Sequence, residues 1–73
     1  LEDARGRVAG IEVKASGSVG ERDFRHLAYL SELLGNRFTC GVVLYTGAQA
    51  LSFGPRLYAL PVSALWRLHA KAT

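Results

Sequence analysis

An apolar, β-branched run from Thr39 to Tyr45 most constrains how this chain can fold. A short run of this kind is typical of a strand that is covered on both faces at the centre of a sheet. The run is also far shorter than the roughly 18 to 20 apolar residues that cross a bilayer. We therefore predict a central strand here, and we expect a cytoplasmic protein with no membrane partner.

The segments before this strand predict a hairpin and a helix. Residues 1–14 read as a hairpin whose turn centres on Arg5-Gly6, so that Asp3 pairs with Val8 and the strand continues to Lys14. The spacing Ser18-x-x-Glu21 has the form of a capping box, and apolar residues then recur at helical intervals. These patterns predict an amphipathic helix over residues 19–34.

The segments after the central strand predict an edge meander and a last helix. Residues 50–53 and 56–60 read as short strands separated by Gly54-Pro55. Pro61 suits the first turn of a helix in which Val62, Leu65, Trp66 and His69 share one face. We therefore predict an α/β (α+β) fold with a mixed β-sheet and flanking helices, in the order ββαβββα.

Composition limits the size and the partners of this fold. The chain has 73 residues, which is one domain at most, and its hydrophobic fraction of 49% is ample for a packed core. Cys40 is the single cysteine and cannot form an internal disulfide, so we expect an inert thiol in the core. The net charge of +3 is compatible with nucleic acid, although so modest an excess is more typical of an ordinary soluble surface.

Glu12 and Lys14 are the candidate catalytic residues. They are two apart on a predicted strand, so both side chains project from one face while Ile11 and Val13 project from the other. Glu12 could hold a divalent cation, most readily magnesium, and Lys14 could orient a water or stabilise charge on a phosphate. Taken alone, the tripeptide is more often an ordinary ion pair at the end of a strand.

The wider sequence resembles a known family. The hairpin, Glu12-x-Lys14, helix and buried strand follow the order of the PD-(D/E)XK nuclease fold, the restriction-endonuclease-like core. In addition, three stretches resemble the C-terminal domain of unknown function of a prokaryotic family of AAA-type ATPases: Val8–Ala15, Gly41–Gly47 and Leu57–Trp66. The resemblance covers nearly the whole chain, and the stretches Leu44–Gly47 and Ala59–Trp66 are far more specific than Glu-x-Lys.

This resemblance implies a nuclease-like fragment of a larger protein. Glu12 and Lys14 match the second acid and the lysine of the nuclease motif, and magnesium would bind at Glu12. The first acid has no match, since Asp3 lies about four residues along the strand from Glu12, or roughly 13 Å. ATP would bind only to an N-terminal ATPase module outside this chain. We therefore expect residues 1–73 to be one domain fragment that binds magnesium weakly and is inactive alone.

Two functions stay open for the full-length protein. One is metal-dependent hydrolysis of DNA or RNA; the other is a non-catalytic interaction or regulatory module that docks onto the ATPase portion, nucleic acid or another subunit. Unpaired strand edges recruit other strands, so we also expect self-association through the edge of residues 11–14. The feature that separates the two functions is the residue opposite Glu12, which we place just before Leu1.

Other polar residues have weaker claims to a function. Four side chains gather on one side of the predicted helix and could touch phosphates, although a solvated helix face is the commoner explanation: Arg22, Arg25, His26 and Tyr29. We expect no metal role for His26 or His69, because neither has partners at ligand spacing. The Gly17–Gly20 segment is better explained as a helix entry than as a cradle for an anion.

Overall fold

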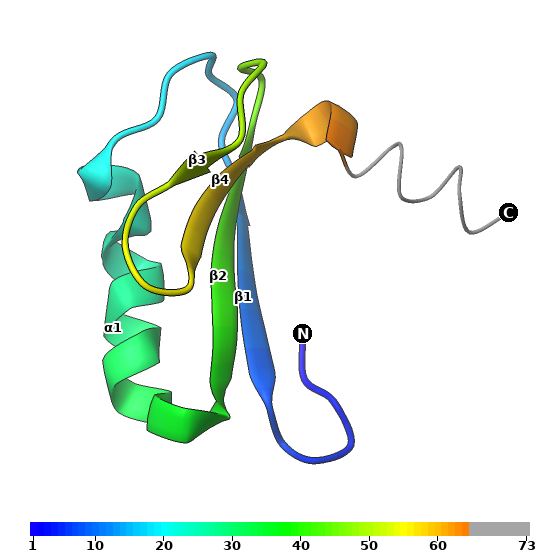
Figure 1. Cartoon of the computed structure of the whole chain (residues 1–73), viewed down its shortest axis with the longest axis vertical. Helices are drawn as coiled ribbons and strands as arrows, with labels where there is room; N and C mark the ends of the chain where they lie inside the picture. Colours follow the sequence, from blue (N-terminus) through cyan, green and yellow to red (C-terminus); the bar gives the residue numbers. More distant parts are fainter. Residues whose placement is uncertain (65–73) are drawn as a thin grey trace, which may run out of the picture.

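The computed structural model describes residues 1–64, which form one mixed sheet with helical segments on one face (Figure 1). The strands are β1 (Val8–Val13), β2 (Phe38–Tyr45), β3 (Leu51–Ser52) and β4 (Leu57–Pro61). The sheet has 4 strands in the order β1-β2-β4-β3. Strands β1 and β4 run parallel to β2 on its two sides, and β3 runs antiparallel to β4 at the outer edge. The central position predicted for residues 39–45 is therefore confirmed.

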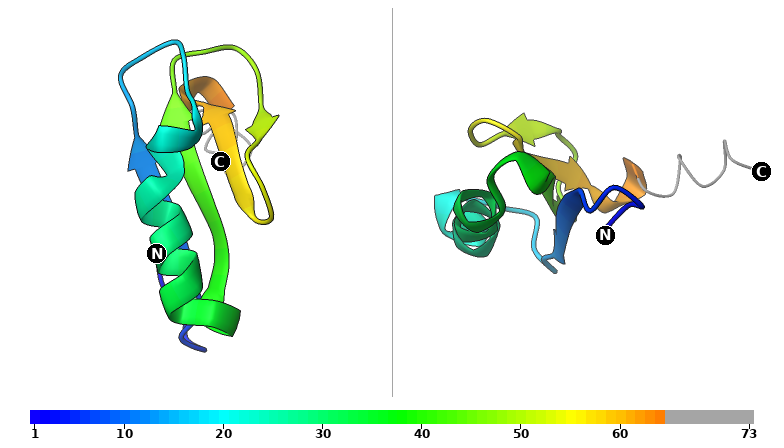
Figure 2. Two further views of the ribbon diagram at one scale, coloured as in Figure 1. Left: turned by 90° about the vertical axis from the view of Figure 1, so that its left-hand side faces the viewer. Right: turned by 90° about the horizontal axis from the view of Figure 1, so that it is seen from below.

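The helical layer connects β1 to β2. It consists of a 3-10 helix, η1 (Glu21–Phe24), the α-helix α1 (Arg25–Leu34) and a second 3-10 helix, η2 (Gly35–Arg37). Figure 2 shows α1 lying along one face of the sheet. Its apolar residues recur at helical spacing at Leu27, Leu30 and Leu34, and these are the side chains that contact the core. No helix within residues 1–64 is long and apolar enough to cross a membrane.

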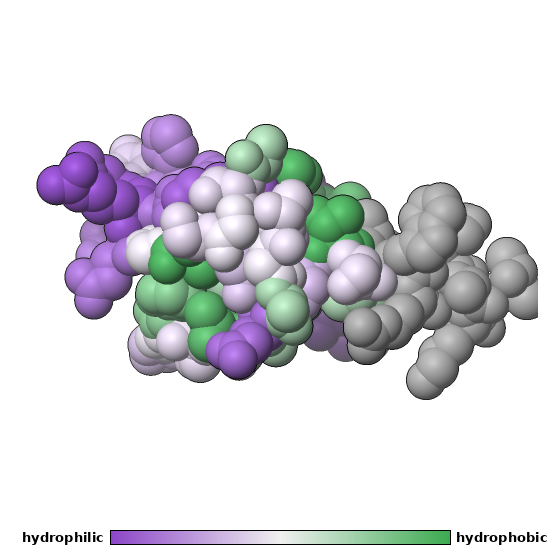
Figure 3. All heavy atoms as spheres, turned by 90° about the horizontal axis from the view of Figure 1, so that it is seen from above, coloured by the Kyte–Doolittle hydropathy of each residue, from purple (hydrophilic) through white to green (hydrophobic). Residues whose placement is uncertain are grey.

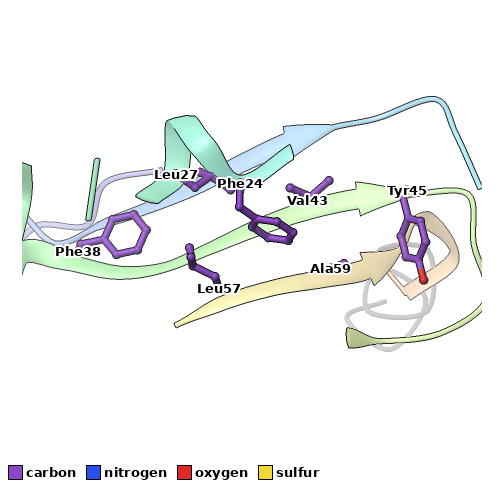
Figure 4. Packing of buried hydrophobic residues seen from close by; sticks show 7 residues of the cluster. All are labelled: Phe24, Leu27, Phe38, Val43, Tyr45, Leu57 and Ala59. Atoms are coloured by element: carbon purple, nitrogen blue, oxygen red, sulfur yellow. The ribbon is translucent and has the colours of Figure 1, made fainter. Parts of the chain in front are cut away.

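The core lies between α1 and the middle of the sheet (Figure 4). The helical segments contribute Phe24 and Leu27, and strands β2 and β4 contribute the remaining buried side chains: Phe38, Val43, Tyr45, Leu57 and Ala59. The Phe24 ring also stacks on Phe53, with ring centroids 4.7 Å apart, which ties the start of the helical layer to the segment after β3. Aromatic pairs in this arrangement stabilise a fold beyond the contribution of the apolar area that they bury.

The opposite face of the sheet is apolar and is open within residues 1–64. The register places the same-facing side chains of three strands together, and we call this set the outer apolar face: Ile11, Val13, Val42, Leu44, Tyr58 and Leu60. Leu44 is buried, whereas Ile11, Val13 and Tyr58 are exposed. The prediction of cover on both faces of β2 therefore holds for the helix side only, since the described residues place no second layer over the outer apolar face.

The hairpin before β1 has a different register from the one that we predicted. Leu1 exchanges both backbone hydrogen bonds with Ala9, and Glu2 forms an isolated antiparallel bridge with Val8. The loop is one residue longer than expected, because the Gly6 amide donates to the Asp3 carbonyl and Gly6 takes a positive φ of 79°. Only glycine adopts this backbone conformation without strain, and a three-residue loop shifts every pair by one.

The start of the helical layer also differs from the prediction. Its N-cap is Gly20, and the Asp23 carboxylate accepts the Gly20 amide at 2.8 Å. The capping contact therefore joins Gly20 and Asp23, where we expected Ser18 and Glu21. The Ser18 amide instead donates to the Ser16 hydroxyl, so this serine belongs to the preceding loop. As a result the α-helix begins at Arg25, later than residue 19.

Strand order corrects the predicted meander. Strand β4 lies between β2 and β3, so that only β3 and β4 form an antiparallel pair. Parallel pairing lets β4 place Leu57 and Ala59 in the core beside β2, whereas the two-residue β3 is exposed. Pro61 is the last residue of β4, and helical structure begins at residue 62. The predicted helix positions Leu65, Trp66 and His69 lie outside the described residues.

Truncation of Leu27 will test the core. Leu27 is 1% exposed, and replacing such a leucine with alanine should lower the free energy of unfolding by about 2 to 5 kcal/mol. Leu33 lies on the same helix at 65% exposure, so Leu33→Ala should change it by less than about 0.5 kcal/mol. Urea denaturation followed by circular dichroism will measure both. Equal losses in the two variants would contradict this packing.

Candidate functional site

Strand β1 places Glu12 and Lys14 on the helix side of the sheet. Glu12 lies opposite Val43, which is one of the core residues beneath α1. The Lys14 amide donates to the Leu44 carbonyl at 2.8 Å, so the ladder with β2 extends one residue past the end of β1. Because side chains alternate along this extended segment, Glu12 and Lys14 share a face as predicted.

These two residues border an open hollow of about 660 Å³ between the end of β1 and the start of the helical layer. The helical side of the hollow is formed by Arg22, Asp23, Arg25 and His26. Seen from above, strongly hydrophilic residues gather on the helix side of the molecule (Figure 3). The crossover from β1 through α1 to β2 thus brings together polar residues from two segments of the chain.

Lys14 is held by an ion pair with Asp23. The Lys14 ammonium donates to Asp23 Oδ2 at 2.8 Å, and the Gly20 amide donates to the same oxygen at 2.8 Å. The Lys14 and Asp23 side chains are 35% and 24% exposed. The Lys14 hydrogen bond, followed by the Gly20 hydrogen bond, lowers the pKa of Asp23 below its ordinary value of 3.8. Asp23 is therefore a firmly ionised neighbour of Lys14.

Glu12 faces a histidine across the hollow. His26 Nδ1 lies 3.3 Å from Glu12 Oε1, and the His26 side chain is almost fully exposed. An exposed contact of this kind contributes little to stability and breaks easily. Glu12 thus remains able to accept hydrogen bonds from water or from a bound molecule.

The helix residues proposed for phosphate contact divide into two groups. Arg22, Arg25 and His26 line the same hollow as Glu12 and Lys14. Tyr29 is exposed and is not part of that lining. The lining of the hollow thus combines the cationic side chains of Lys14, Arg22 and Arg25 with the carboxylates of Glu12 and Asp23.

The donor set of the hollow does not by itself fit a magnesium ion. Glu12 offers one carboxylate, and Asp23 Oδ2 is already engaged by an ammonium group that would repel a cation. Within residues 1–64 no cluster of three or more histidine, cysteine or acidic side chains is placed to hold a metal. Asp3 lies opposite Arg7, five residues along the strand from Glu12, or roughly 16 Å, so it cannot complete the site.

Two further residues of the sequence analysis lie apart from the hollow. Cys40 is half-buried in β2, on the side of the sheet away from α1, so its thiol is less enclosed than the core position that we expected. His69 lies outside the described residues. The hollow is thus lined by residues 12–14 and by Arg22, Asp23, Arg25 and His26, with Val43 beneath it.

Asp23 is the residue that the sequence analysis missed. The available signal was its place three residues after Gly20, where an acidic side chain commonly accepts a backbone amide at a helix start. The sequence Ser18-x-x-Glu21 also fits the capping-box pattern, and it therefore predicted a different N-cap. Only the folded chain shows that the same carboxylate also reaches Lys14, nine residues earlier in the sequence.

The fold and the hollow define a small mixed α/β domain with a polar site beside an edge strand. The chain belongs to a family described as a domain of unknown function, DUF4143, whose match covers residues 1–65. No curated protein and no solved structure matched this chain. The family membership agrees with the resemblance to a domain of unknown function, and the function itself must be argued from the site.

The ionisation of Asp23 gives a pH prediction. Because the pKa of Asp23 is lowered in the folded state, the stability from its charged contacts is present above pH 3.8 and is lost as the pH falls through the lower, folded-state pKa. Asp23→Asn should therefore flatten the decline of the unfolding free energy between about pH 5 and about pH 2. Urea denaturation at a series of pH values will measure the slope.

Glu21→Gln is the matched control, because it removes the same charge from the same 3-10 helix without removing the Lys14 contact. The pKa of Asp3 is also lowered, chiefly by the Arg7 backbone amide, and this contribution stays in both variants. If Glu21→Gln flattened the slope as much as Asp23→Asn does, the Lys14 contact would not be its source.

Proposed function

We propose that this domain is the nuclease-like module of a larger protein and that it acts on phosphodiester bonds of DNA or RNA. The observation that carries the proposal is that Glu12 and Lys14 lie side by side at a hollow of about 660 Å³, together with Arg22 and Arg25. Arginine and lysine bind phosphate oxygens through charge-assisted hydrogen bonds. The hollow thus offers cations for a phosphate and a carboxylate beside them.

The arrangement of the elements supports this proposal. A hairpin leads into β1, which carries Glu12, and α1 then returns the chain to the parallel strand β2. This is the order that the resemblance to a restriction-endonuclease-like core implies. The same resemblance suggests that an AAA-type ATPase module binds ATP elsewhere in a longer prokaryotic chain.

The hairpin register gives the position that a second acid would take opposite Glu12. Leu1 pairs with Ala9, so each residue further along β1 faces one residue further back along the first arm. Glu12 is three residues beyond Ala9 and would face the third residue before Leu1 in a longer chain. An aspartate there would give two facing carboxylates, which is the donor set that a magnesium ion takes together with water and phosphate oxygens.

The chain's own residues have separate tasks in this proposal. Arg22 and Arg25 bind the phosphate, and the Lys14 ammonium stabilises the negative charge that develops on it. The Glu12 carboxylate accepts hydrogen bonds from water or from the bound molecule in the hollow. A metal ion, when bound with the help of an upstream acid, would lower the pKa of a coordinated water.

A nuclease assay of the full-length protein tests the proposal. We expect cleavage of DNA or RNA with magnesium or manganese, and we expect Glu12→Ala and Lys14→Ala each to reduce it by roughly a hundredfold or more. Glu32→Ala is the matched control, because this exposed glutamate on α1 lies outside the hollow. Cleavage that survives Glu12→Ala would rule out the catalytic function. A full-length protein that binds metal and carries the upstream acid but cleaves nothing would rule it out as well.

A second candidate is a non-catalytic interaction module, and the outer apolar face favours it. Ile11 and Val13 are exposed there, on the edge strand β1. Within the described part of the chain, residues 10–13 of β1 pair with β2 on one side only. Such an edge can add a strand from a second copy of the chain and extend the apolar face at the same time.

Sedimentation velocity over a range of concentrations tests this association. We expect the chain to self-associate and Val13→Lys to weaken it, because a charge on an edge strand opposes pairing. Val13 is 74% exposed, so the substitution should leave folding intact. Leu33→Lys, on the exposed side of α1, is the matched control. A wild-type chain that stays monomeric, or equal effects of the two lysines, would contradict association through β1.

A further inference from the structure

The contact between Lys14 and Asp23 has an unusual second anchor. Asp23 Oδ2 accepts the Lys14 ammonium and the Gly20 amide, both at 2.8 Å. The backbone amide lies on the same helix start as Asp23 and fixes the direction of the carboxylate. Asp23 is therefore a rigid acceptor, and the Lys14 ammonium is held at one place on the wall of the hollow.

A lysine needs such an acceptor if it is to act on a bound phosphate. Its four-carbon stem is flexible, and its ammonium group is a compact charge with three donors. The hydrogen bond to Asp23 uses one donor and leaves two that can turn toward the hollow. Groups that act on a substrate must be held within about 0.5 Å of their working position, which a free lysine on an open surface is not.

We infer that Asp23 is a positioning residue, which holds the Lys14 ammonium at the hollow ready to receive a phosphate oxygen. The catalytic consequence rests on the proposed function, whereas the placement of the ammonium does not. A simpler role would be that Asp23 only starts the helical layer through Gly20. Asp23→Asn separates the two roles, because an asparagine oxygen still accepts the Gly20 amide but carries no charge for Lys14.

The first experiment observes the Lys14 ammonium directly. Lys14 and Lys71 are the lysines of the sequence, so lysine labelled with ¹⁵N gives a simple spectrum that Lys14→Arg assigns. We expect exchange of the Lys14 ammonium hydrogens with water to rise roughly two- to fivefold in Asp23→Asn, in line with the usual strength of a partly exposed ion pair. Lys71 is the internal reference. Unchanged exchange at Lys14 in a folded Asp23→Asn variant would overturn the inference.

The second experiment uses the cleavage activity of the full-length protein. We expect Asp23→Asn to lower kcat roughly tenfold, with a smaller change in KM, because the contact places a group that acts in the transition state. Adding Asp23→Asn to Lys14→Ala should cause no further loss, since residues that act through one another are not additive. A purely structural Asp23 would lower the activity of Lys14→Ala again, and that result would also overturn the inference.

The two experiments fail in different ways. If the full-length protein cleaves nothing while Asp23→Asn still frees the Lys14 ammonium, the proposed function is wrong and the placement of Lys14 by Asp23 stands. If cleavage depends on Lys14 and neither readout responds to Asp23→Asn, the proposed function stands and the positioning role is wrong. Thermal unfolding followed by circular dichroism, with Glu21→Gln as the control, shows that the variants are folded.

Discussion

The packing of Leu27 onto the sheet is the contact on which the rest of the structure depends. A Cβ atom on Gly41 would lie 3.0 Å from Leu27 Cβ, and one on Gly10 would lie 2.5 Å from Leu27 Cδ2. The absence of side chains at these two positions therefore lets α1 approach β1 and β2 closely. The close approach buries Leu27 against Phe38 and sets the distance between the start of the helical layer and the end of β1. Asp23 can reach Lys14, and His26 can reach Glu12, only because that distance is short.

The edge strand β1 carries two different surfaces on its two sides. Glu12 faces the polar hollow beneath the helix start, whereas Ile11 belongs to the outer apolar face; Val13 belongs to that face and also borders the hollow. This alternation follows from the two-residue period of a strand, and it places the proposed phosphate contacts and the proposed association surface on opposite faces. Substitutions at neighbouring positions can therefore affect one property and leave the other. The catalytic and the interaction functions are for this reason separable within a single strand.

The sequence was sufficient for a helix between two strands, for the last strand of the described chain at residues 57–61, and for the face shared by Glu12 and Lys14. The run from Thr39 to Tyr45 predicted the central strand, because a short apolar run rich in β-branched residues is typical of a buried strand. The strand order was not predictable, since β2 can pair with either of the strands that follow it and the choice depends on which of them fills the core. The hairpin register and the Asp23 contact were missed for a common reason. Each depends on a single backbone feature, the positive φ of Gly6 and the Gly20 amide that donates to Asp23, and neither leaves a periodic pattern in the sequence.

The strength of the Lys14 ion pair bears on how the hollow could work. A partly exposed ion pair contributes little to stability, and a charge-assisted hydrogen bond from Lys14 to a phosphate oxygen can replace it. A phosphate oxygen that enters the hollow can therefore share or take the Lys14 ammonium without a large cost. Asp23 would not move when this happens, because the Gly20 amide continues to hold its carboxylate. The ammonium would then return to the same place after release of the phosphate, which is what a group that acts repeatedly requires. The contact between Lys14 and Asp23 is weak enough to open, whereas the Gly20 amide keeps the Asp23 carboxylate in place. This combination suits a positioning role better than a purely structural one.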